Sequence, residues 1–107
     1  MVWTVLFVSD AAQAELSALP ADMRARFARI AELIRDHGLE NVREPHVRHL
    51  EGKLWELRLS GRAGIARSVY VTASGKRIVV LRTFIKRTEK TPRRELEIAR
   101  ERARDVE

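Results

Sequence analysis

The chain contains no cysteine. Disulfide bonds, thiolate metal sites and nucleophilic catalysis by cysteine are therefore excluded. Its longest apolar runs are far shorter than the roughly 20 residues that span a bilayer. The opening segment, MVWTVLFV, lacks the basic region and the small-residue cleavage site of a signal peptide. We therefore expect a cytoplasmic protein with no membrane contact.

Familiar catalytic motifs are missing as well. The sequence has no glycine-rich phosphate loop, no metal-binding His-x-x-x-His helix and no recognisable Ser-His-Asp arrangement. His46 and His49 flank the entrance to an expected strand, but no carboxylate or third histidine completes a ligand set. We expect neither a metal nor a cofactor.

Positive charge is abundant and unevenly distributed over what we expect to be one domain, residues 1–107. The net charge is +6, yet residues 1–42 carry four Arg against six acidic residues, whereas residues 43–107 carry 17 basic against nine acidic residues. Of the 21 basic residues, 17 are Arg, whose planar guanidinium suits bidentate phosphate contacts. Two interpretations remain open: a surface that binds polyanions, or a merely solvated basic surface.

Apolar periodicity in the first third of the chain predicts a strand and two helices. Val2–Val8 is β-branched and aromatic, which is typical of a strand buried on both sides. A short helix should follow, starting at Ser9 or Asp10 and ending near Leu19. The four-three spacing of apolar residues after Pro20 predicts a second helix that ends at Gly38.

The rest of the chain predicts an antiparallel meander followed by a helix. Apolar residues alternate from Val47 to Ser60, and short turns separate this segment from two more β-rich runs, Ile65–Val71 and Arg77–Ile85. Thr91 is the expected N-cap of the last helix, with Pro92 in its first turn. The fold class is therefore α+β, in the order β-α-α-β-β-β-α: a small antiparallel sheet, an N-terminal helical hairpin on one face and a C-terminal helix. The other face should be partly covered and could carry a site.

The cations of the meander are the best candidates for chemistry. Arg58 and Arg67 lie on neighbouring strands and could approach each other across the sheet. Arg67 is surrounded in sequence by apolar residues, so its charge requires either an anionic ligand or an acidic partner, such as Glu56 or Glu51. Both interpretations stay open.

Aromatic residues are few, and the two tryptophans and the single tyrosine each have two interpretations. Trp3 and Trp55 could stack on a nucleobase, although strand tryptophans more often belong to a core. Tyr70 is the single tyrosine, and its phenol could donate a proton or only form a structural hydrogen bond.

The segments LEGKLWELRLSGRAGIARSVYV and GKRIVVLRTFIKRTEKTPRRELEIARER together resemble the phage-derived RelE/HigB-type toxins of type II toxin–antitoxin systems, within the RelE/ParE superfamily. The resemblance runs from about Val47 to Arg102. It implies a RelE-like fold and a metal-independent endoribonuclease that cuts messenger RNA on the ribosome, with the ribose 2′-hydroxyl as nucleophile. It also implies neutralisation by a helix-turn-helix antitoxin of the HigA/Xre type. A monomeric free toxin is one of the interpretations that stay open.

The resemblance also assigns roles to residues. It implies catalytic functions, in phosphate binding and transition-state stabilisation, for Arg58, Arg67, Lys86 and Arg87. The RNA-contacting cations would be Lys53, Arg82, Lys90, Arg93 and Arg94.

This chain departs from the family pattern at two places. It has Ala66 where an aromatic residue often precedes the strand arginine, and Arg82-Thr83-Phe84 where His-Gly-Phe is common. The general base therefore stays open among a lysine, Glu51 and His49. Two other functions also stay open: a ParE-like toxin that poisons a protein such as DNA gyrase, and a non-catalytic relative that binds only antitoxin or RNA.

Overall fold

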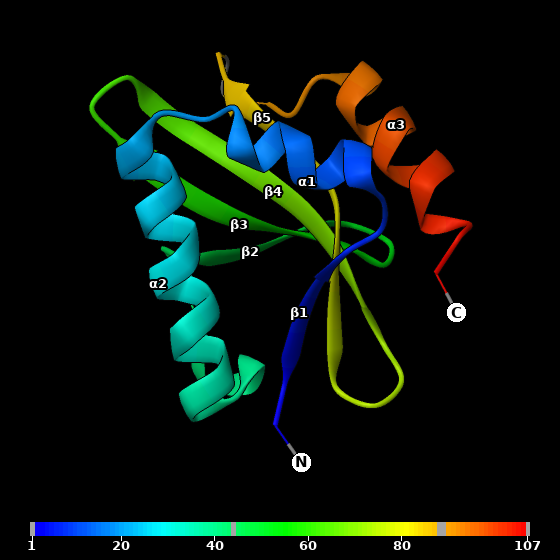
Figure 1. Cartoon of the computed structure of the whole chain (residues 1–107). Helices are drawn as coiled ribbons and strands as arrows, with labels where there is room; N and C mark the ends of the chain where they lie inside the picture. The colour runs from blue at the N-terminus through cyan, green and yellow to red at the C-terminus, as the bar shows by residue number, and fades with distance from the viewer. Residues whose placement is uncertain (1, 44, 88–89, 107) are drawn as a thin grey trace.

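The computed structural model describes residues 2–43, 45–87 and 90–106, and Figure 1 shows the arrangement of its elements. Within these residues, three α-helices pack around a five-stranded sheet with the strand order β1-β5-β4-β3-β2. The strands are β1 (Thr4–Phe7), β2 (Val47–Glu51), β3 (Leu54–Gly61), β4 (Gly64–Ala73) and β5 (Arg77–Lys86). The helices are α1 (Asp10–Ser17), α2 (Ala21–His37) and α3 (Arg93–Ala103), with a short 3-10 turn, η1, at Leu39–Asn41.

The predicted α+β class and the order of its elements are confirmed, but the segment from Val47 to Ser60 is not one strand. It forms a hairpin, β2–β3, that turns at Gly52 and Lys53. Gly52 has φ +54°, a left-handed conformation that glycine adopts without a steric penalty. No apolar side chain lies between Leu50 and Leu54, so the turn falls on a polar break in a segment that was predicted as one strand.

The first strand also differs from the prediction, because it is an edge strand and not a strand buried on both sides. β1 pairs in parallel with β5, from Thr4 opposite Arg77 to Phe7 opposite Val80. Its exposed and half-buried residues alternate, and Leu6 is 40% exposed. The sheet is therefore mixed, with an antiparallel meander of four strands and one parallel edge.

The larger core lies between the sheet and α2. The predicted stripe on this helix is confirmed: Met23, Phe27, Ile30 and Ile34 are all buried. They pack against Leu57 and other residues of the sheet, and the rings of Phe7 and Phe27 stack at 5.8 Å. In Figure 1, α1 and α2 run in clearly different directions, so the two helices form a corner rather than a parallel-sided hairpin.

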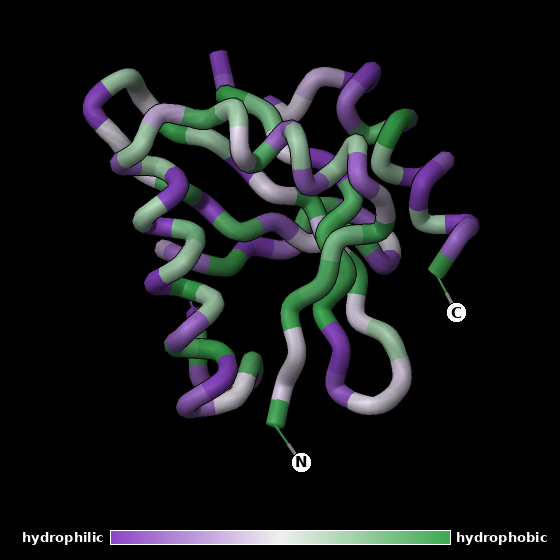
Figure 2. Tube along the Cα trace, in the orientation of Figure 1, coloured by the Kyte–Doolittle hydropathy of each residue, from purple (hydrophilic) through white to green (hydrophobic). Residues whose placement is uncertain are grey.

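The opposite face of the sheet is covered by α3. A smaller apolar core there joins Leu54, Val69 and Leu81 to Ala99 on the helix. Figure 2 shows that α3 is mostly hydrophilic, with few apolar positions along it. A helix of this composition covers the sheet with a narrow stripe and leaves room for polar groups beside it.

The start of α3 differs from the sequence prediction. The helix begins at Arg93 with Pro92 in the N-cap position, and no side chain caps it. The hydroxyl of Thr91, which we expected to be the cap, instead accepts a hydrogen bond from the guanidinium of Arg67. None of the helices within the described residues is long and apolar enough to cross a membrane.

Candidate functional site

The register of the sheet places predicted cations side by side. Arg58 on β3 is directly opposite Arg67 on β4, and Arg67 is opposite Phe84 on β5. Lys86 follows Phe84 by two positions, so its side chain leaves the same face of the sheet. This is the face that α3 covers. The predicted approach of Arg58 and Arg67 is therefore confirmed.

A buried carboxylate lies among these cations. Nε of Arg67 is 2.9 Å from Oε2 of Glu56, and the two side chains are 3% and 1% exposed. The acidic partner predicted as one alternative for Arg67 is thus present. Among the described residues, neither oxygen of Glu56 accepts a hydrogen bond. The attraction between the two charges therefore holds the pair together, and the lone pairs of the carboxylate accept no hydrogen bond from the described residues.

The environment of Glu56 acts on its acidity in two opposing ways. Burial raises the pKa of this carboxyl above its ordinary value, and nearby positive charges oppose the rise only in part. The charges that oppose it belong to Arg67, Arg58, Lys86 and Arg48. One buried carboxylate surrounded by four cations leaves a strongly positive site with a proton acceptor inside it.

A cavity of about 400 Å³ opens above this pair, and we call it the cationic cavity. Its lining residues come from β2, β3, β4, the segment that enters α3 and α3 itself: Arg48, Leu50, Glu51, Glu56, Arg67, Lys90, Thr91 and Leu96. Arg67 and Glu56 form its buried floor, whereas Arg48 and Lys90 are exposed. Exposed cations above a buried Arg suit the binding of a phosphate group.

Other predicted cations lie outside this cavity. Arg93 lines an adjoining cavity of about 450 Å³ that shares Thr91 with the cationic cavity. Arg87 and Arg94 are exposed near the two ends of the segment that joins β5 to α3. Lys53 lies in the β2–β3 turn and lines a separate cavity together with Arg100. The structure therefore does not bring Lys53 together with the other candidates.

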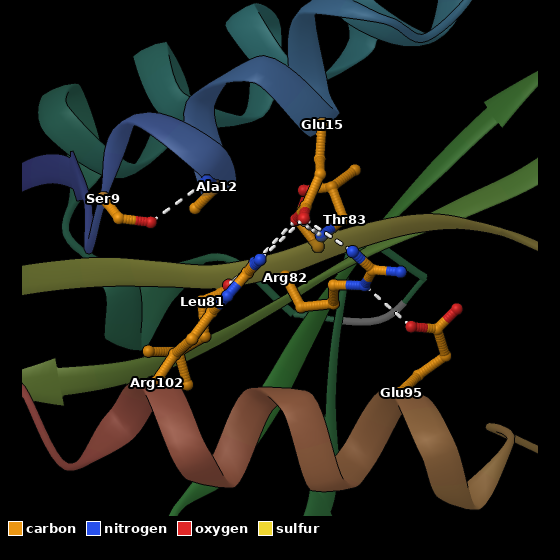
Figure 3. Close-up of polar contacts among 9 residues, drawn as sticks. Ser9, Ala12, Glu15, Leu81, Arg82, Thr83, Glu95 and Arg102 are labelled. Atoms are coloured by element: carbon orange, nitrogen blue, oxygen red, sulfur yellow. Dashed lines mark hydrogen bonds and ion pairs between the residues drawn. The ribbon is translucent and has the colours of Figure 1, made fainter.

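Arg82 does not line the cationic cavity and instead belongs to an ion-pair network, which Figure 3 shows. Its Nη1 is 2.5 Å from Glu15 of α1, and its Nε is 2.7 Å from Glu95 of α3. Arg102 of α3 also binds Glu15, at 2.8 Å, and donates to the carbonyl of Leu81. These contacts tie α1, β5 and α3 together and account for the charge of Arg82 without a nucleic acid.

The structure also shows the surroundings of Glu51 and His49, two of the candidate general bases. Glu51 lines the cationic cavity, but it forms an ion pair with Arg100. His49 donates from Nε2 to the carbonyl of Gly52 at 2.9 Å and lies edge-on to Trp55. Glu56, by contrast, forms an ion pair with Arg67 of the cation cluster. Tyr70 is 1% exposed, and burial raises the pKa of its phenol. Both observations fit a structural role for this residue rather than proton donation.

Sequence reasoning treated Glu56 only as an ion-pair partner and did not single out Arg48. A signal for Glu56 was present: it alternates with Leu57 and Leu59, on the side of the strand that carries Arg58. A buried acid at such a position, flanked by cations, is a recognisable mark of a functional site. Nothing in the sequence shows that Arg48 comes close to it, because the β2–β3 hairpin was not predicted.

Comparison with known proteins supports one family. The model of a family described as phage derived protein Gp49-like (DUF891) matches residues 14–104, most of the chain. That family is associated with RelE-like toxins of toxin–antitoxin systems. No curated protein matches the chain.

Proposed function

Since the chain belongs to the family of phage-derived Gp49-like proteins, we propose that it is a type II toxin that cuts messenger RNA on the translating ribosome. The observation that carries this proposal is the cationic cavity, with Arg67 and the carboxylate of Glu56 on its floor. A surface that only blocked a protein target would not require a proton acceptor buried among cations.

The proposed reaction is an internal phosphoryl transfer. The ribose 2′-hydroxyl attacks the adjacent phosphorus, the bond to the 5′-oxygen breaks, and the products carry a 2′,3′-cyclic phosphate and a 5′-hydroxyl. Negative charge accumulates on the phosphate oxygens during attack, and fixed cations stabilise it without reorganising. Arg67, Arg58 and Lys86 have this role, while Lys90, Arg93 and Arg94 hold the neighbouring RNA backbone.

Glu56 is the proton acceptor in this mechanism. A general base works best when its pKa lies near the working pH, and burial raises the pKa of Glu56 in that direction. Among the described residues its oxygens accept no hydrogen bond, although Nε of Arg67 is 2.9 Å from Oε2. The 2′-hydroxyl proton passes to Glu56 as the new P–O bond forms, and the departing 5′-oxygen takes up a proton from water.

We further propose that an antitoxin encoded beside the gene neutralises the protein, and that the antitoxin carries a helix-turn-helix domain of the HigA/Xre type. The net charge of +6 favours an acidic segment in such a partner. Covering the cationic cavity would be sufficient to block RNA.

Induced expression in a bacterial host tests the proposed function. Wild-type protein should arrest growth, and Lys86→Ala/Arg87→Ala should not. The matched control is Arg26→Ala/Arg35→Ala, which removes two exposed charges from α2, far from the cavity, and should stay toxic. Arrest by all three proteins would reject the assignment of the site. Arrest with intact messenger RNA would instead favour a ParE-like poison of a protein target.

A further inference from the structure

A second cavity, of about 660 Å³, lies on the other side of β2 from the cationic cavity. We call it the aromatic cavity, because Trp3, Trp55 and Tyr70 line it together with residues of β2 and of the turn after α2. Its volume is within the range of roughly 300–1,000 Å³ that is usual for ligand sites. We propose that it binds an unpaired nucleobase of the RNA whose phosphate lies in the cationic cavity. This inference rests on the function proposed above.

Trp55 is the first reason. It is 39% exposed, although the alternation of its strand turns it toward the α2 side, where Leu57 and Leu59 are fully buried. His49 lies edge-on against it, with ring centroids 4.8 Å apart, and holds the indole from one side. A fixed, partly exposed indole is the platform on which single-stranded RNA bases stack.

Trp3 supplies the second reason. Its indole lines the same cavity as that of Trp55 and is half-buried. A second indole in the cavity adds flat apolar surface, on which an unpaired nucleobase can stack.

The third reason is that positive charge extends from the cationic cavity to the aromatic cavity. This favours RNA over an apolar protein segment as the ligand. Arg48 lines both the aromatic cavity and the cationic cavity. It lies on β2, the edge strand of the sheet, around which a single RNA strand can pass from one face to the other. Arg43 and Arg48 are exposed and outnumber the one exposed acid that lines the aromatic cavity, Glu40, so the net charge along this route is positive.

Binding of a fluorescently labelled 2′-O-methyl RNA oligonucleotide, which cannot be cut, tests the inference by fluorescence anisotropy at several salt concentrations. Trp55→Ala should weaken binding about tenfold, since stacking contributes roughly 1–3 kcal/mol per base. The dependence of affinity on salt should stay unchanged, because no charge is removed. Lys86→Ala/Arg87→Ala should weaken binding and lower the salt dependence.

Two further variants control for folding and for general apolar contact. Trp55→Phe keeps an aromatic ring and should recover most of the affinity. Leu6→Ala removes a similarly exposed apolar side chain from the opposite edge of the sheet and should change nothing.

The outcomes separate this inference from the proposed function. Wild-type affinity in Trp55→Ala, together with weak binding by Lys86→Ala/Arg87→Ala, would overturn the base site and leave the nuclease proposal standing. Normal RNA binding by Trp55→Ala with loss of neutralisation by a co-expressed antitoxin would make the cavity a protein-docking site. Absence of RNA binding by the wild type would count against both proposals.

Discussion

Arg67 and Glu56 form an ion pair beneath the cationic cavity, with Nε of the arginine 2.9 Å from Oε2 of the glutamate. Both side chains are buried, so each charge depends on the other for its stability in the fold. The same two groups form the floor on which a phosphate would rest. Structural and functional roles are therefore combined in one contact, and experiments must separate them.

A pair of substitutions makes that separation. Arg67→Ala leaves the Glu56 carboxylate buried without its partner and should lower the free energy of unfolding by about 3–5 kcal/mol. The double variant Glu56→Leu/Arg67→Met replaces the pair with apolar side chains and should recover most of that loss. Urea unfolding measures both, and neither variant should cut RNA. A double variant that is stable and still cuts would remove the pair from the mechanism.

Glu56 should also set the pH dependence of cutting. The carboxylate must be ionised to accept a proton, and burial raises its pKa above the ordinary 4.5. The rate should therefore fall as the solution is acidified, with a midpoint above 4.5, in a single-turnover assay on a short RNA. Glu56→Gln should lose this dependence along with most of the activity. A variant that kept both would exclude Glu56 as the base.

The ion-pair network around Glu15 should make the free energy of unfolding depend on pH, at values below the ordinary carboxyl pKa of 4.5. Burial tends to raise the pKa of Glu15, but hydrogen bonds from Arg102, Thr83 and Arg82 outweigh it and lower the pKa below 4.5. A depressed pKa adds stability above the unfolded value, and this stability is lost as the pH falls through the folded value.

Glu15→Gln should therefore lower the free energy of unfolding by about 2 kcal/mol at neutral pH, and the difference should shrink in acid. Thermal unfolding across a pH series measures this effect. Glu32→Gln is the control, because its ion pair with Arg29 is exposed and should contribute little. If Glu15→Gln lowered the free energy of unfolding equally at all pH values, the loss would come from packing and not from the charge of Glu15.

Ile30 tests the packing of α2. It is completely buried against the sheet, so Ile30→Ala should cost about 2–5 kcal/mol by urea unfolding. The exposed Ala28 and Arg29 beside it offer control sites on the same turn. A near-neutral Ile30→Ala would contradict the placement of this helix.

The sequence predicted the parts of the fold that depend on local pattern. The four-three spacing from Met23 to Ile34 predicts the buried stripe of α2, and the short turn between β3 and β4, which pairs Gly61 with Gly64, brings Arg58 opposite Arg67. Both patterns arise from backbone geometry alone. The resemblance to a toxin family pointed to the same cations.

What the sequence could not predict depends on irregularities and on contacts between distant segments. Leu81 is an extra residue between two registers of the β4–β5 ladder, and such a bulge shifts the alternation of side chains after it. Arg82, the next residue, reaches Glu15 of α1, 67 residues away in the chain. Similarly, only the folded hairpin shows that Arg48 lies near Glu56, its cross-strand partner.

The most direct test of the central claim is the chemistry of the cut ends. Purified wild type, Lys86→Ala/Arg87→Ala and Arg26→Ala/Arg35→Ala are each added to ribosomes translating a defined messenger, and the fragments are mapped and their termini identified. We predict cuts inside translated codons with 2′,3′-cyclic phosphate and 5′-hydroxyl ends, absent only for the first variant. Intact messenger with the wild type, or equal cutting by all three proteins, would contradict the account.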